Sequence, residues 1–107
     1  LIARDSWLQH KPEVATAVAA AIHRAVAWMQ ARSPHAVLDR LPARYRSDPD
    51  VDLKSIATVV PMFSATGAMS AEGAEAVRRM LALSVEKVRS GSFDLSRTWT
   101  NEYLVQP

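Results

Sequence analysis

The chain of 107 residues contains no cysteine, and this absence excludes disulfides, thiolate metal ligands and cysteine nucleophiles. It has only three glycines, so it holds no glycine-rich phosphate-binding loop, and no G-x-S-x-G segment is present. Its longest apolar run, residues 17–22, ends at His23 and Arg24, well short of the roughly 20 residues that cross a bilayer. We therefore do not expect a membrane-spanning segment.

The charge is small and of mixed sign. Thirteen Lys and Arg residues against 11 Asp and Glu residues give a formal net charge of +2, which is too small and too evenly spread to indicate a nucleic-acid partner. A hydrophobic content of 49% suits a folded chain rather than a disordered one. We expect residues 1–107 to form a single helical segment that is a piece of a larger protein.

A long amphipathic helix predicted at residues 12–32 organises the chain. Alanine, the best helix former, dominates its interior, and Pro12 suits the first turn of a helix. His23 lies on its polar side. Apolar residues recur every three or four positions and form a stripe that we expect to face the core: Val14, Val18, Ala21, Ile22, Ala25, Trp28 and Met29.

The remaining elements are predicted to be shorter helices, which makes the segment all-α with about five helices. Each start has a capping residue: Asp5 or Ser6, then Ser33, Asp48 and Ser70. The helix after Ser70 is expected to continue to Gly91, and its inward face is predicted to be Ala74, Val77, Leu81, Ser84, Val85 and Val88. Asp94 and Thr100 are predicted to cap one-turn helices at residues 95–97 and 101–105. The abrupt apolar start, Leu1–Arg4, suggests the remnant of a β-strand whose sheet lies outside this chain.

Acidic residues around Asp48 repeat at every second position, as at the start of a calcium-binding EF-hand loop. Leu53 and Val59 stand where that loop needs glycine and glutamate, so helix capping is the better interpretation of Asp48, Asp50 and Asp52. His10, His23 and His35 do not pair on one helix face, and we expect them to be solvated.

Two further groups allow a binding or a structural interpretation. Trp7, Trp28 and Trp99 would form either an aromatic ligand cage or packing anchors, and packing is favoured. Arg44, Arg46, Arg78 and Arg79 would form either an anion patch or solvated faces, and solvated faces are favoured. The sequence therefore assigns no catalytic, cofactor-binding or metal-binding residue, predicts no cofactor, and leaves the ligand-binding residues unknown.

Four stretches in order resemble one family. They are LIARDSWLQHKPEV at residues 1–14, the alanine-rich helix with Trp28 followed by Ser33-Pro34, FSATGAMSAE at residues 63–72, and DLSRTWTNEYL at residues 94–104. Together they are similar to the C-terminal part of extracytoplasmic solute-binding proteins of the nitrate, sulfonate, taurine and thiamine-precursor type. The resemblance spans nearly all of this chain but only part of the family's longer polypeptide.

The resemblance implies a two-lobed α/β parent of the periplasmic binding protein type II fold. Such a protein is not an enzyme: it binds a small solute between its lobes and delivers it to the permease of an ABC importer in the periplasm or outside the cytoplasm. Because most cleft residues would lie before Leu1, no ligand-binding residue is carried over.

Two alternatives remain open. The chain is either a stand-alone helical interaction module or a fragment of an enzyme whose chemistry lies elsewhere. If this segment is isolated, its uncovered apolar stripes predict a homodimer or a swapped packing, formed through the long helix.

Overall fold

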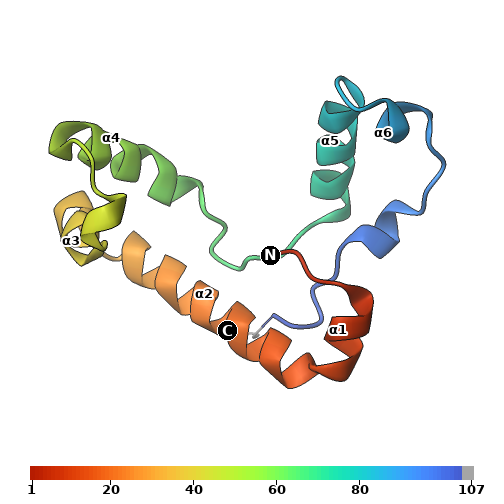
Figure 1. The fold of residues 1–107 in the computed structure, drawn as a ribbon, viewed down its shortest axis with the longest axis horizontal. Helices are drawn as coiled ribbons and strands as arrows, with labels where there is room; N and C mark the ends of the chain where they lie inside the picture. Colours follow the sequence, from red (N-terminus) through yellow and green to blue (C-terminus); the bar gives the residue numbers. More distant parts are fainter. Residues whose placement is uncertain (105–107) are drawn as a thin grey trace. The chain divides into compact units, whose positions relative to one another are not determined.

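The computed structural model describes residues 1–104, of which 67% are helical and none is in a strand, so the predicted all-α segment is confirmed (Figure 1). Residues 1–4, which were expected to be the remnant of a strand whose sheet lies outside this chain, form no strand in the described part of the chain. Arg4 has an extended backbone, with φ −83° and ψ 141°, but no second strand lies beside it to complete a hydrogen-bonded ladder.

Six α-helices and three 3₁₀ turns make up the described part of the chain, against about five helices predicted. In order they are α1 (Asp5–His10), α2 (Pro12–Gln30), α3 (Pro34–Arg40), η1 (Ala43–Tyr45), α4 (Pro49–Val59), η2 (Val60–Met62), α5 (Ala71–Ala82), α6 (Glu86–Ser90) and η3 (Leu95–Thr98). The long helix therefore ends two residues earlier than the predicted range of 12–32.

The described residues divide into two compact units, residues 1–67 and residues 68–104. In the first unit, α3 and α4 lie side by side, α1 packs on the start of α2, and η2 contacts α2 (Figure 1). Its buried side chains are Val37 and Leu38 on α3 and Ala15 on α2, with 4%, 9% and 7% of their surfaces exposed. In the second unit, α5 contacts α6 and η3, and Ala74 is the buried residue.

Local capping explains where several helices begin. The Ser33 Oγ accepts the Ala36 N–H at 3.3 Å, and the Ser70 Oγ accepts the Gly73 N–H at 3.0 Å. Both caps were predicted. The predicted cap of α1 was wrong, because α1 begins after Arg4 without any side-chain cap and Asp5 lies in its first turn.

The single helix predicted from Ser70 to Gly91 is interrupted, and this prediction is also wrong. The chain turns tightly after α5, where the Ser84 N–H donates to the Leu81 carbonyl three residues back. Val85 then adopts an extended backbone, with φ −112° and ψ 104°, which suits its β-branched side chain, and α6 begins after it. A tight turn followed by one extended residue thus divides the helix in two.

The structure of residues 94–104 agrees more closely with what the sequence predicted. The Asp94 Oδ1 accepts the Ser96 N–H at 3.0 Å and caps η3, as expected. The Thr100 Oγ1 accepts the Glu102 N–H at 3.2 Å, but residues 101–104 form turns instead of a helix, and residue 105 of the predicted range lies outside the described residues.

Candidate functional site

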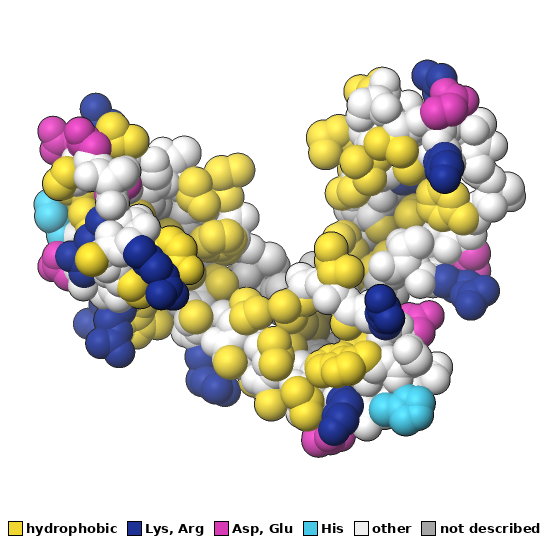
Figure 2. Space-filling view, in the orientation of Figure 1, with side chains coloured by type: hydrophobic (Ala, Val, Ile, Leu, Met, Phe, Trp, Pro, Cys, Tyr) yellow, Lys and Arg dark blue, Asp and Glu magenta, His cyan; other side chains and the backbone are white. Residues whose placement is uncertain are grey.

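The most extended candidate surface is an apolar stripe along α2, which Figure 2 shows as hydrophobic side chains gathered over that helix on the face in view. We call the α2 stripe the exposed residues Val14, Val18, Ala21, Ile22, Ala25 and Trp28. Its large side chains keep about 40% of their surfaces in solvent: 39% for Val14, 40% for Val18, 44% for Ile22 and 38% for Trp28. The prediction that this stripe faces the core is therefore wrong for these residues.

A second apolar face explains the error. Ala15 is buried and Ala19, Val26 and Met29 are half-buried, so the helix presents this neighbouring face to its own chain. The two faces together make an apolar arc much wider than the one that a helix on a protein surface needs. The contacts within the first unit use only half of that arc, so the first unit does not cover the α2 stripe.

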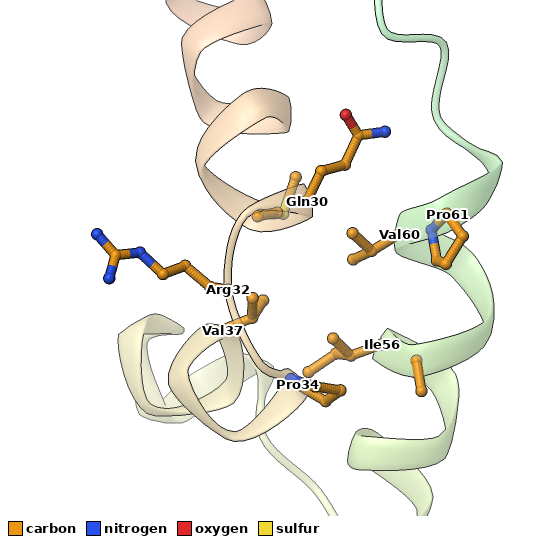
Figure 3. A pocket seen from close by; sticks show the side chains of 9 residues that line it. Gln30, Arg32, Pro34, Val37, Ile56, Val60 and Pro61 are labelled. Atoms are coloured by element: carbon orange, nitrogen blue, oxygen red, sulfur yellow. The ribbon is translucent and has the colours of Figure 1, made fainter.

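An open groove of about 430 Å³ lies where α2 ends and α3 and α4 meet (Figure 3). Val37, Ile56 and Val60 point into the space between these helices. The groove is lined by Met29, Gln30, Arg32, Pro34, Val37, Ile56, Ala57, Val60 and Pro61. Its volume falls within the range of small-molecule pockets, roughly 300–1,000 Å³.

The lining of this groove supports contact with an apolar group but not acid–base chemistry. Its one charged side chain, Arg32, points away from the other lining residues and lies over the Trp28 ring, 5.9 Å from the ring centroid. No carboxylate, histidine, serine or threonine is among the lining residues, so the groove has neither a nucleophile nor a general base.

Two polar side chains of α2 hold the loop that follows η2. The His23 Nε2–H donates to the Ala65 carbonyl at 2.9 Å, and the Gln30 Nε2–H donates to the Phe63 carbonyl at 3.0 Å. These residues are seven positions apart, so both lie on one side of the helix. His23 was expected to be solvated, but it is half-buried and has this structural role. Its partner lies 42 residues further along the chain, and no local sequence pattern identifies such a contact.

A similar long-range contact occurs in the second unit. The Asn101 side chain accepts the Met69 N–H at 3.0 Å and donates to the Met69 carbonyl at 2.9 Å. This pair of bonds joins the tail to the residues just before α5, and it was not predicted.

Asp48 caps the start of α4. The Asp48 Oδ1 accepts the N–H groups of Asp50 and Val51 at 2.9 and 3.2 Å, as the capping interpretation predicted. The Asp52 carboxylate accepts the backbone N–H and the hydroxyl of Ser47 at 2.8 and 2.9 Å. Across residues 1–104, no three His, Asp or Glu side chains converge as a metal site would require.

The arginines of the proposed anion patch interact mainly with their own surroundings. Arg46 donates to the carbonyls of Leu41 and Asp39 at 2.8 and 2.6 Å, and Arg44 lies over the Tyr45 ring at 4.9 Å. Arg78 forms two hydrogen bonds with the Glu75 carboxylate, at 2.8 and 2.6 Å, which lower the pKa of Glu75 and raise that of Arg78. Arg79 is exposed.

The tryptophans and the remaining histidines do not form a site either. Trp7 and Trp28 keep 41% and 38% of their surfaces exposed, so the prediction that they are buried anchors is wrong, whereas Trp99 is half-buried in the second unit. His35 is exposed, and the His10 Nδ1–H donates to the Ser6 carbonyl one turn earlier at 2.6 Å.

The chain matches no known protein family, no curated protein and no solved structure. In the described part of the chain, no helix combines the length and the apolar character that crossing a bilayer requires, as the sequence predicted. Within residues 1–104, the features that remain as candidates for function are the α2 stripe and the groove beside it.

Proposed function

We propose that this chain is the C-terminal helical part of the solute-binding component of an ABC importer, and that it has no catalytic activity. Its solute would be a small sulfonate, nitrate or a thiamine precursor, bound by other parts of the protein in the periplasm or outside the cytoplasm. Four ordered stretches support this proposal: residues 1–14, the alanine-rich helix through Ser33-Pro34, residues 63–72 and residues 94–104.

The observation that carries the proposal is the uncovered apolar surface. The chain exposes 8589 Å², whereas two separate compact bodies of these two lengths would expose roughly 7,100 Å². Among the described residues, only Ala15, Val37, Leu38 and Ala74 make up the buried hydrophobic core. Helices that cover a β-sheet in a two-layer lobe have this pattern, because each needs a sheet to bury its remaining apolar face.

The second unit supports the same conclusion. On α5, the side chains of Val77, Met80 and Leu81 keep 43%, 63% and 42% of their surfaces exposed, although their spacing of three and four residues is that of a helix face made for packing. Each unit therefore carries an apolar helix face that its own residues do not cover.

The test starts from the natural gene product, whose intact mass is measured first. We expect a mass well above 11.8 kDa, and a melting temperature that rises by about 5 °C when one of taurine, nitrate or a thiamine pyrimidine is present at about 100 times its Kd. A natural gene product with a mass near 11.8 kDa would refute the proposal. A larger product that none of these solutes stabilises would refute the proposed solute class.

A stand-alone helical interaction module is the second candidate function, and the α2 stripe favours it. A chain of 107 residues whose longest helix leaves half of its apolar arc uncovered is suited to bind another helix. The two candidates differ in what covers that stripe: a sheet of the same protein, or a separate chain.

A further inference from the structure

We draw no further inference here: the strongest candidate, the open groove where α2 ends and α3 and α4 meet, is lined mainly by apolar side chains, and nothing in the structure shows what covers it.

Discussion

At the scale of single residues, the ion pair between Arg78 and Glu75 is the clearest electrostatic feature of the second unit. The two hydrogen bonds from the Arg78 guanidinium stabilise the charged carboxylate and hold the pKa of Glu75 below its ordinary value. Both side chains are 35–40% exposed, so water screens the pair. The pair therefore serves as a local probe of α5 and makes a small contribution to stability.

We predict that Arg78→Gln raises the pKa of Glu75 towards its ordinary value, as measured by NMR titration of the Glu75 carboxyl. Because the folded-state pKa is lowered, the pair stabilises the folded chain above the ordinary glutamate pKa, and this stabilisation is lost as the pH falls through the lowered pKa. The variant should lack that pH dependence. The matched control, Arg79→Gln, removes a weaker charge effect and should move the Glu75 pKa less; an equal shift would contradict the assigned cause.

The cap of α4 provides a second test at a single residue. Asp48→Ala removes the oxygen that accepts the Asp50 and Val51 N–H groups, and it should lower the free energy of unfolding by about 1 kcal/mol in urea titrations. Asp48→Asn keeps an acceptor in the same place and should lose only a fraction of that value. If both variants were equally destabilised, the charge and not the hydrogen bonds would explain the effect.

At the scale of elements, the turn at residues 64–67 requires glycine at its end. Gly67 has φ of 70°, in the left-handed region, and its N–H donates to the Ser64 Oγ at 3.0 Å. We predict that Gly67→Ala lowers the free energy of unfolding by roughly 1 kcal/mol, because a Cβ disfavours this conformation. Gly67→Asn should be tolerated better, since asparagine enters this region more readily. Chemical denaturation compares the two variants with the unsubstituted chain, and a Gly67→Ala variant as stable as that chain would refute the argument.

The helix starts show which parts of the structure are determined by nearby residues in the sequence. The starts of α3, α4 and α5 were predicted because Ser33, Asp48 and Ser70 bond to N–H groups two or three residues away, and such contacts depend on the sequence nearby. The break at Ser84 was missed because the apolar spacing from Ala74 to Val88 continues through it. Periodicity reports which residues are apolar, but it does not report whether the backbone between them remains helical.

The sequence predicted which residues form the α2 stripe, but it did not predict that they face away from the core. The residues of the α2 stripe were identified from their spacing, yet they were assigned to the core. Ala15 and Ala19 occupy the face that contacts the chain itself. Because alanine occurs on every side of this helix, its presence does not identify the buried face. The contacts from His23 and Gln30 to the loop after η2 were not predictable, since they join residues 42 and 33 positions apart.

At the scale of the whole molecule, the two candidate functions differ in what covers the exposed apolar surface, whereas both share the same small core. Leu38 is 9% exposed and belongs to the core that the chain builds for itself, whereas Val18 is 40% exposed and belongs to the α2 stripe. Substitution at Leu38 affects the chain under either function. Substitution at Val18 changes the free energy of unfolding only when another part of the protein or another chain covers the stripe.

We predict that Leu38→Ala lowers the free energy of unfolding of the 107-residue chain by about 2–4 kcal/mol, through lost burial and the cavity left behind. Val18→Ser, measured at a concentration where the chain is monomeric, should change it by less than about 1 kcal/mol because the side chain already contacts water. In a longer gene product whose sheet covers α2, the same Val18→Ser would bury a hydroxyl and leave a void, and its cost should rise to about 1–3 kcal/mol. Urea unfolding of both proteins, with and without Val18→Ser, measures the loss of unfolding free energy in each. A much larger loss in the longer protein supports a covering sheet. Equally small losses support a stripe that remains free for another chain.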